Sequence, residues 1–305
     1  MRVLQRPQNA GERVVALGMF DGVHRGHRAL LLTARKLADE LGVPLRVCTF
    51  NRHPLEILRP ENPPVMLSTI PEKAAQLFSA GVDETELIPF DQSIADLEPA
   101  EFLERMRSMI TVRGIVAGWN YTFGRNGSGN AELLREDGEK HGYRVIIVPP
   151  MTLEDGTVIS SSLVRGFLLE GNTEKAAELL GYTYSLTGTV AQGKHQGHKL
   201  GFPTANIEPW KRKALPKYGV YTGMLETETE MLPAVVNIGT QPTIPSGKVT
   251  VEAHILTESQ ELYGQKVRLS LLKMLRPEKR FDSVEELMRQ IEQDREEALR
   301  LFHMA

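Results

Sequence analysis

Residues 14–27, with the sequence VVALGMFDGVHRGH, decide the fold of the first half of this chain. The apolar run Val14–Met19 predicts a buried strand. After it, apolar residues recur at helical spacing and stop before Gly42, which predicts a helix that ends at this glycine; they are Leu30, Leu31, Ala34, Leu37, Ala38 and Leu41. The glycine-containing loop Gly18–His27 therefore connects a strand to a helix.

The same alternation continues along the first half. Short apolar runs predict strands, and amphipathic stretches predict helices. This order indicates a parallel sheet with helices on both faces, whose ligands bind beyond the carboxyl ends of the strands. The predicted strands are Leu45–Phe50, Thr85–Phe90, Gly114–Gly118 and Arg144–Val148, and the predicted helices are Pro71–Ala80 and Pro99–Ile110.

The pattern changes near residue 183, so we predict one domain over residues 1–183 and a second over 184–305. Two short helices, Ser162–Glu170 and Thr173–Leu180, precede the change. Short strand-like runs separated by turn residues follow it, and they predict a small antiparallel barrel or sandwich. These runs are Leu186–Ala191, Gly219–Leu225, Ala234–Ile238, Thr250–Leu256 and Val267–Leu275, and a last helix is predicted over Ser283–Phe302.

Composition narrows the class of protein. The chain has 305 residues, 41% hydrophobic and 25% charged, which is typical of about two globular domains. A net charge of −3 disfavours nucleic acid or anionic lipid as the main partner. Cys48 is the single cysteine, which excludes a disulfide within the chain and favours a reducing compartment. Without a membrane-spanning apolar run or a signal-peptide core, we expect a soluble, cytoplasmic protein.

The loop Gly18–His27 has the features of a phosphate-binding site. Free backbone N–H groups and the positive end of the helix dipole attract anions at such a position. Gly22 and Gly26 would let a phosphate approach the backbone. His24 and His27, together with Arg165, can act as positive donors that neutralise charge on a transferring phosphoryl group. The two histidines could instead be polar side chains on the surface, or a pair of metal ligands. The metal alternative lacks further Cys or carboxylate ligands at the usual spacing.

The HxGH sequence at His24–His27 resembles the nucleotidyltransferase superfamily, which pairs it with an ISSTxxR signature. Residues 159–165 are ISSSLVR, with Ser162 at the usual threonine. The longer string GMFDGVHRGH resembles the bacterial bifunctional riboflavin kinase/FMN adenylyltransferases, also called prokaryotic FAD synthetases. This resemblance implies catalytic roles for His24, His27 and Arg165, and ATP contacts by Gly18, Phe20, Asp21, Gly22, Gly26, Ser160, Ser161 and Ser162.

Two further motifs of the first half resemble the same family. Residues 49–54, TFNRHP, are similar to its TFxPHP loop with Arg52 in place of proline. Residues 118–124, GWNYTFG, are similar to its G-x-[DN]-F-x-F-G loop with Tyr121 in place of phenylalanine. The resemblance implies that Asn120 contacts ATP and that His53, Pro54 and Phe123 contact flavin. A stiff turn and loop hydrogen bonding are the structural alternatives.

Residues 193–206, GKHQGHKLGFPTAN, resemble the riboflavin kinase signature. A glycine loop with two lysines can fold donors around phosphates, and Thr204 and Asn206, two apart on a strand, point to one face and offer oxygens suited to Mg²⁺. The family holds Mg²⁺–ATP there. The resemblance further implies ATP contacts by Gly193, Lys194 and Lys199, and flavin contacts by Gly201, Phe202 and Pro203. Gln196 and His198 stand where the family often has arginine.

Residues 236–243, VNIGTQPT, and 251–254, VEAH, resemble two later kinase motifs. The resemblance implies that Asn237 contacts flavin and that Glu252 is the catalytic base. A base is needed because the ribityl hydroxyl loses its proton as it attacks the γ-phosphate. An outward-facing strand carboxylate is the alternative for Glu252. The last helix either covers the flavin or is a solvated helix.

The resemblance implies an N-terminal α/β Rossmann-like nucleotidyltransferase domain and a C-terminal antiparallel β-barrel riboflavin kinase domain with a terminal helix. The expected steps are riboflavin + ATP → FMN + ADP, then FMN + ATP → FAD + pyrophosphate. The expected partners are riboflavin, FMN and ATP with Mg²⁺; FMN and FAD are products, and neither membrane nor nucleic acid is expected. A single-activity enzyme, a cytidylyltransferase-like enzyme and a flavin-sensing regulator, whose RNA-binding patch would be Trp210–Lys213, are the alternatives.

Overall fold

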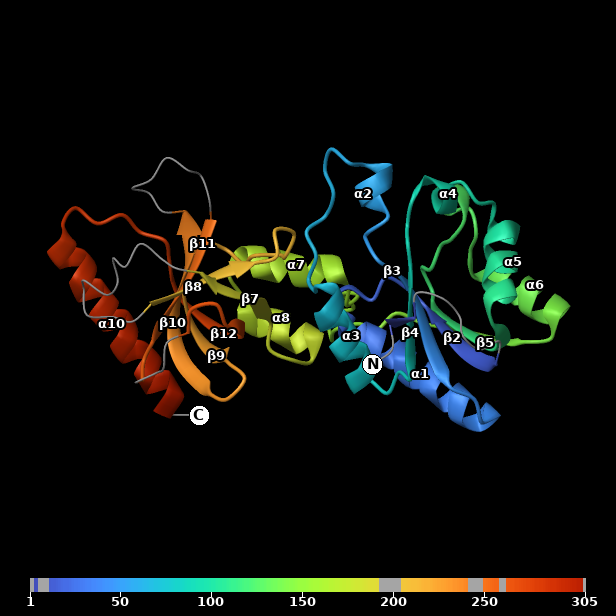
Figure 1. Cartoon of the computed structure of the whole chain (residues 1–305), viewed down its shortest axis with the longest axis horizontal. Coiled ribbons are helices and arrows are strands. Elements are labelled where there is room, and N and C mark those ends of the chain that lie inside the picture. The colour runs from blue at the N-terminus through green and yellow to red at the C-terminus, as the bar shows by residue number, and fades with distance from the viewer. Residues whose placement is uncertain (1–2, 5–10, 192–203, 241–248, 258–261, 304–305) are drawn as a thin grey trace. The chain divides into compact units, whose positions relative to one another are not determined.

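The computed structural model describes residues 3–4, 11–191, 204–240, 249–257 and 262–303. The chain divides into two compact units, Met1–Ser161 and Ser162–Ala305 (Figure 1). No helix of the described part is long and apolar enough to cross a membrane. The helices α7 and α8, which the sequence placed in the first domain, pack with the second unit. Thr173 of α8, for example, donates a hydrogen bond to the carbonyl of Leu272 at 2.9 Å.

The first unit is a six-stranded parallel sheet with the strand order β1-β4-β3-β2-β5-β6. The strands are β1 (Val3–Leu4), β2 (Glu12–Leu17), β3 (Leu45–Phe50), β4 (Glu84–Ile88), β5 (Thr111–Gly118) and β6 (Arg144–Val148). The helices are η1 (Asp21–Val23), α1 (Arg25–Leu41), α2 (Leu55–Leu58), α3 (Ile70–Ser79), α4 (Gln92–Ala95), α5 (Pro99–Met109), η2 (Arg125–Gly127) and α6 (Ala131–His141).

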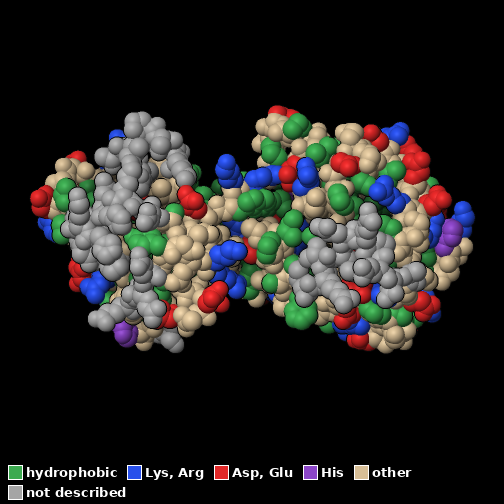
Figure 2. All heavy atoms as spheres, viewed as in Figure 1, with side chains coloured by type: hydrophobic (Ala, Val, Ile, Leu, Met, Phe, Trp, Pro, Cys, Tyr) green, Lys and Arg blue, Asp and Glu red, His purple; other side chains and the backbone are tan. Residues whose placement is uncertain are grey.

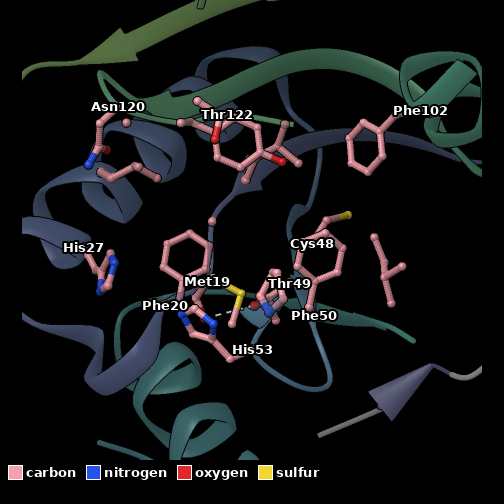
Figure 3. Close-up of a pocket in the computed structure, with 17 residues that line it drawn as sticks. Met19, Phe20, His27, Cys48, Thr49, Phe50, His53, Phe102, Asn120 and Thr122 are labelled. Atoms are coloured by element: carbon pink, nitrogen blue, oxygen red, sulfur yellow. Dashed lines mark hydrogen bonds between the residues drawn. The ribbon is translucent and has the colours of Figure 1, made fainter. Parts of the chain in front are cut away.

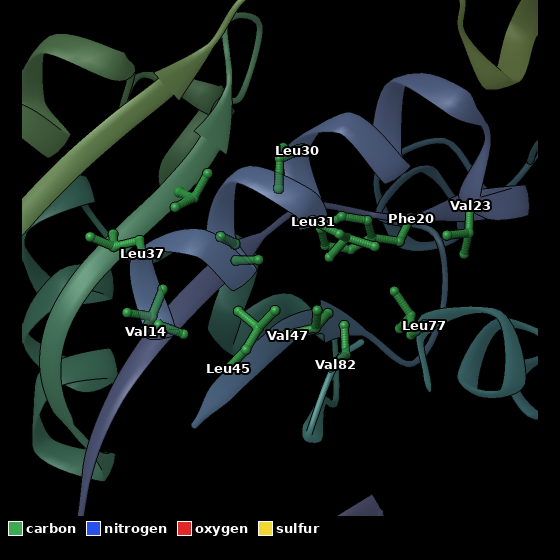
Figure 4. Close-up of a cluster of buried hydrophobic side chains, with 14 residues drawn as sticks. Val14, Phe20, Val23, Leu30, Leu31, Leu37, Leu45, Val47, Leu77 and Val82 are labelled. Atoms are coloured by element: carbon green, nitrogen blue, oxygen red, sulfur yellow. The ribbon is translucent and has the colours of Figure 1, made fainter. Parts of the chain in front are cut away.

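Strand β2 is buried on both faces, as a central strand of a parallel sheet requires. Val14 and Ala16 pack with α1 and α3 in one apolar cluster (Figure 4). Val15 and Leu17 belong to a second cluster with α5 and α6 on the opposite face. Complete burial of a valine or leucine contributes roughly 1.5–3 kcal/mol, so this strand anchors the unit. The predicted parallel sheet with helices on both faces is confirmed.

Local signals explain where the helices begin and end. Thr69 caps α3 reciprocally with Glu72, and Gly42 ends α1 in the left-handed conformation with φ of 66°. Among the strands and α-helices of the first unit, four escaped the sequence analysis. Three of these, β1, α2 and α4, have at most four residues, and α6 buries only Leu134 and Gly138, so its helical period is weak.

The second unit begins with two short helices, and its strands form a closed barrel in the order β10-β11-β8-β7-β12-β9. The open choice between barrel and sandwich is therefore settled in favour of the barrel. Closure gives every described strand two neighbours and leaves no edge unpaired. The elements are α7 (Ser161–Glu170), α8 (Thr173–Leu180), β7 (Ser185–Ala191), β8 (Thr204–Pro209), β9 (Gly219–Glu226), β10 (Met231–Thr240), β11 (Val249–Ile255), β12 (Lys266–Pro277) and α10 (Val284–His303).

The terminal helix α10 packs on the barrel. Its Ala298 is fully buried in an apolar cluster with Val220 of β9 and Val235 of β10. Asp294, only 4% exposed, accepts hydrogen bonds from Arg276 of β12 at 2.9 Å and 2.8 Å. A bidentate guanidinium–carboxylate pair fixes orientation as well as distance. The helix is thus anchored along one face, whereas its other residues are exposed or partly exposed, as the alternative of a solvated helix expects. Its role in covering the flavin stays a prediction.

Candidate active sites

The loop after β2 is held in an uncommon backbone conformation. Phe20, Gly22 and Val23 all have positive φ angles, of 49°, 75° and 37°. Glycine adopts this region freely, but a β-branched residue such as valine is strained there. Strain of this kind persists only where the surrounding structure determines the conformation, and it concentrates at functional sites. The same loop supplied the predicted phosphate-binding residues.

The carboxylate of Asp21 fixes this loop from within. Asp21 is 2% exposed and accepts hydrogen bonds from the backbone N–H groups of Leu67 and Ser68 at 3.0 Å and 3.1 Å. The Ser68 hydroxyl accepts from the Gly22 N–H at 3.1 Å, and the Ser161 hydroxyl donates to the Asp21 carbonyl at 2.9 Å. The carboxylate of Asp21 thus organises the loop, and the ATP contact of this residue stays a prediction.

His24 and His27 form a stacked pair at the start of α1. Nδ1 of His24 accepts a hydrogen bond from the His27 N–H at 3.3 Å, and the ring centroids lie 3.7 Å apart. A Cβ at Gly26 would lie 3.2 Å from the His24 ring, so a glycine there leaves space for the imidazole. Because Nδ1 of His24 accepts, the neutral ring carries its proton on Nε2.

Both imidazoles are neutral at pH 7. Burial lowers the pKa of His24 to about 4. Burial also holds the pKa of His27 well below its usual range, and His24 and Lys73 lower it further. A neutral imidazole still donates one N–H, so the predicted donor role is possible without positive charge. For the metal alternative, the described residues contain no group of three or more His, Cys, Asp or Glu that could hold an ion.

A cavity of about 350 Å³ opens beside this histidine pair, at the carboxyl ends of β2, β3, β4 and β5 (Figure 3). This is the position expected for a ligand of a parallel sheet. One part of the wall is aromatic and apolar, and the rest offers imidazole, hydroxyl and amide groups. The residues that line the cavity include Met19, His27, Phe50, His53, Phe102, Asn120 and Tyr121.

The three predicted flavin residues of this unit, His53, Pro54 and Phe123, differ in whether they line the cavity. His53 and Pro54 line the cavity, and Nδ1 of His53 also accepts a hydrogen bond from the Leu55 N–H at 3.1 Å. His53 therefore makes the local hydrogen bond of the stiff-turn alternative and lines the cavity as well. Phe123 is 5% exposed and stacks behind Tyr121, with centroids 5.9 Å apart, whereas Tyr121 itself lines the cavity.

Lys73 of α3 is a residue that the sequence analysis missed. It is 3% exposed, and its Nζ donates a hydrogen bond at 2.8 Å to the carbonyl of Met19, which also accepts from the Thr49 hydroxyl at 3.1 Å. Burial lowers the pKa of Lys73 to about 8. A signal was present, because Lys73 lies four residues before the buried Leu77 and so falls on the apolar face of its helix.

The second signature of the first half spans the boundary between the two units. Ile159 is buried, Ser160 is partly buried, and Ser161 bonds to the Asp21 carbonyl as described above. Ser162 and Arg165 lie on α7 within the second unit. The roles predicted for Ser162 and Arg165 at the triphosphate therefore remain predictions.

The barrel brings three predicted residues into one row across neighbouring strands. Glu252 of β11 pairs with Asn206 of β8 on one side and with Asn237 of β10 on the other. Side chains of directly paired residues share a face and have Cβ atoms about 4.5–5.5 Å apart. Thr204 and His254 form the next pair, with Oγ1 of Thr204 3.3 Å from Nδ1 of His254.

This row faces outward from the barrel. On β8 and β11 the buried residues Ala205, Ile207, Val251, Ala253 and Ile255 alternate with the partly exposed Thr204, Asn206, Glu252 and His254. The predicted strand that presents Thr204 and Asn206 on one face is confirmed. The other predicted kinase residues, Gly193, Lys194, Lys199, Gly201, Phe202 and Pro203, lie outside the described residues, as do Gln196 and His198.

The basic patch that the regulator alternative requires, Trp210–Lys213, exposes one lysine fewer than its sequence suggests. Lys213 is 4% exposed, and its Nζ lies 5.0 Å above the ring of Tyr184, whereas Trp210 is exposed. Lys213 thus contributes to the packing of the second unit. On the face shown in Figure 2, acidic and basic side chains are interspersed over both units.

The fold and the two sites define a class of two-domain enzymes that join a nucleotidyltransferase-like α/β unit to a flavokinase barrel. Comparisons with known proteins agree. Residues 6–163 match the family model for FAD synthetase, and residues 180–302 match that for riboflavin kinase. The chain belongs to the bifunctional riboflavin kinase/FMN adenylyltransferase family.

Individual relatives cover nearly the whole chain. The bifunctional riboflavin kinase/FMN adenylyltransferase of Bacillus subtilis (strain 168) is 34% identical over 97% of this chain and 94% of its own length. That of Escherichia coli (strain K12) is 35% identical over 95% and 92%. A crystal structure described as a macrolide-efflux protein from Streptococcus pneumoniae has a TM-score of 0.85 and 34% identity, with 94% of each chain covered.

Proposed function

We propose that this chain converts riboflavin to FAD in two ATP-dependent steps, one in each of the predicted domains, 1–183 and 184–305. One contrast carries the proposal: the barrel presents a carboxylate, Glu252, in its polar row, whereas the described residues that line the first-unit cavity include no carboxylate. An alcohol nucleophile needs a base, but a phosphate nucleophile does not. The two sites therefore suit two different nucleophiles.

In the first step, the carboxylate of Glu252 accepts the proton of the terminal ribityl hydroxyl. The hydroxyl oxygen attacks the γ-phosphorus of ATP, the bond to the bridging oxygen breaks, and ADP leaves. ATP enters as its magnesium complex, and the Thr204 hydroxyl and Asn206 amide oxygen fit that cation because both are hard oxygen donors on the face of Glu252. Gly193, Lys194 and Lys199 are proposed for the phosphates, and Asn237, Gly201, Phe202 and Pro203 for the flavin.

In the second step, a phosphate oxygen of FMN attacks the α-phosphorus of ATP, and pyrophosphate leaves with the bridging oxygen. A phosphate monoester has a second pKa near 6, so at pH 7 the nucleophile is already largely anionic. His24 and His27 provide neutral N–H donors, and the N-terminus of α1 supplies backbone donors for the phosphates. Ser160, Ser161, Ser162 and Arg165 complete the proposed triphosphate contacts.

The aromatic part of the cavity fits the flavin ring. Phe50, Phe102 and Tyr121 line the cavity, as do His53 and Pro54. Stacked or edge contacts with an aromatic ring add about 0.5–1.5 kcal/mol beyond the burial of area. FMN and FAD bind as substrate and product in this scheme. A cytoplasmic location is part of the proposal and rests on the single cysteine, Cys48, which is buried as a free thiol.

A product assay tests this function. Purified protein is incubated with riboflavin, ATP and Mg²⁺, and flavins are separated by chromatography over time. We expect FMN to appear first and FAD to follow. Absence of FMN would refute the kinase assignment, and failure to form FAD from supplied FMN would refute the adenylyl-transfer assignment. Tight flavin binding without turnover would favour the regulator.

A further inference from the structure

The adenylyl-transfer site needs positive charge, and its histidines do not supply it. A triphosphate and the pyrophosphate that leaves carry several negative charges, which a site must balance with cations or aligned dipoles. His24 and His27 are neutral at pH 7 because both are buried and stacked on each other. They act only as hydrogen-bond donors. The positive charge at the site therefore comes from groups other than these two histidines, among which Arg165 is already proposed above.

Lys73 places one further cation next to the loop. Its ammonium is buried under the loop and bonds to the carbonyl of Met19, a residue that lines the cavity. It is also close enough to His27 and Asp21 for electrostatic interaction with both. The Asp21 carboxylate accepts hydrogen bonds from Leu67 and Ser68. Burial of an ammonium group is costly, so a lysine at this position points to a use for its charge.

The bond from Lys73 also bears on the shape of the loop. The Met19 carbonyl immediately precedes Phe20, the first of the residues with positive φ. Two donors, Lys73 and Thr49, hold this carbonyl in place. The lysine therefore acts on the loop through a hydrogen bond and on any bound phosphate through its charge.

We propose that Lys73 is a positioning residue for adenylyl transfer, which holds the Gly18–Val23 loop through Met19 and provides fixed positive charge for the triphosphate and for pyrophosphate. This inference rests on the function proposed above. An ammonium group and a phosphate several ångströms apart attract each other strongly at a partly buried site. Loss of the Lys73 charge is therefore expected to weaken polyphosphate binding roughly tenfold or more. Binding of an uncharged nucleoside should change little.

The test uses the full chain and the variants Lys73→Met, Lys73→Gln and Lys73→Arg. Methionine keeps an unbranched apolar side chain and removes both donor and charge. Glutamine keeps a donor for the Met19 carbonyl, and arginine keeps the charge. Lys36→Met, at an exposed position on α1, is the matched control. FAD formation from supplied FMN gives kcat, the KM for ATP, and inhibition constants for pyrophosphate and adenosine at this site alone. Riboflavin phosphorylation in the same samples serves as a reference.

We expect Lys73→Met to raise the KM for ATP and the inhibition constant of pyrophosphate about tenfold, with adenosine inhibition changed less than twofold. Lys73→Gln should raise both constants by less than Lys73→Met, because it keeps a donor for the Met19 carbonyl, and Lys73→Arg should restore part of the loss. Unchanged pyrophosphate inhibition in both neutral variants would overturn the proposal. So would an equal weakening toward pyrophosphate and adenosine, which would indicate a packing role. Wild-type protein unable to form FAD from FMN would instead refute the proposed function, before any variant is compared.

Discussion

Glu252 of β11 lies directly opposite Asn206 of β8, and both side chains are on the outward face of the barrel. The register of the backbone ladder sets their separation, because paired residues of an antiparallel sheet share a face. Asn237 continues the same row on β10. The proposed base and the proposed ligand of the magnesium–ATP complex are thus positioned by regular strands and not by a loop.

Glu252→Gln should abolish FMN formation and leave FAD formation from supplied FMN intact. The amide keeps the shape of the side chain but cannot accept the proton, and loss of a general base costs about 10²–10⁴ in rate. Chromatographic assays started from riboflavin and from FMN measure the two activities separately. Glu228→Gln, at an exposed position in the turn between β9 and β10, is the control. Loss of both activities in folded Glu252→Gln would contradict two separate sites.

His27→Ala should have the reverse effect. The variant removes an N–H donor near the cavity, and loss of one such donor typically lowers kcat by about 10²–10³. Riboflavin phosphorylation should stay at the wild-type rate, since that chemistry is assigned to the barrel. His141→Ala, exposed at the end of α6, should change neither rate. If His27→Ala made FAD from FMN at the normal rate, His27 would have no part in the reaction.

The first unit should lose stability in mild acid. Folding lowers the pKa of His24 from 6.5 to about 4, so between these values the unfolded chain binds the proton more tightly than the folded one. The free energy of unfolding therefore falls as pH decreases from 6.5 toward 4, by on the order of 3 kcal/mol from this group. Urea titrations across this range measure the slope.

His24→Asn is the informative comparison for that slope. Asparagine is a preferred N-cap residue, so it can keep the hydrogen bond at the start of α1 without titrating. The variant should show a flatter dependence of unfolding free energy on pH than the wild type. An unchanged slope would mean that His24 is not the group responsible.

Asp294→Ala should loosen the terminal helix. The substitution leaves the Arg276 guanidinium without its bidentate partner, and breaking a buried pair on one side typically costs about 3–5 kcal/mol. Thermal unfolding of the second unit and hydrogen exchange in α10 should both report the loss. Asp282→Ala, exposed just before α10, is the control. Equal thermal stability of the two variants would show that this ion pair does not anchor the helix.

Much of this architecture could be predicted from local sequence. The run at Leu45–Phe50 and the helix over Thr173–Leu180 coincide with the observed elements because their apolar residues repeat at the period of the structure they form. The Glu252 row could be predicted only in part. Motif resemblance suggested its members, but the pairing with Asn206 and Asn237 depends on strand register, which arises from the barrel as a whole.

The charge state of the first-unit site could not be predicted from sequence. The nearby His24 and His27 suggested positive donors for phosphate charge, but burial and stacking keep both imidazoles neutral. Lys73 is 46 positions after His27, and only the packing of α3 against the loop brings its charge near the imidazole. Electrostatic properties of this kind depend on tertiary structure, which a single motif does not contain.

The division of one chain into two compact units has a consequence for the cell that makes it. If each unit catalyses one step, the two catalysts are always synthesised in equal numbers. Their molar ratio then cannot be adjusted by differential gene expression. The balance between the FMN and FAD pools must depend on turnover rates, on substrate supply and on how fast other proteins withdraw FMN.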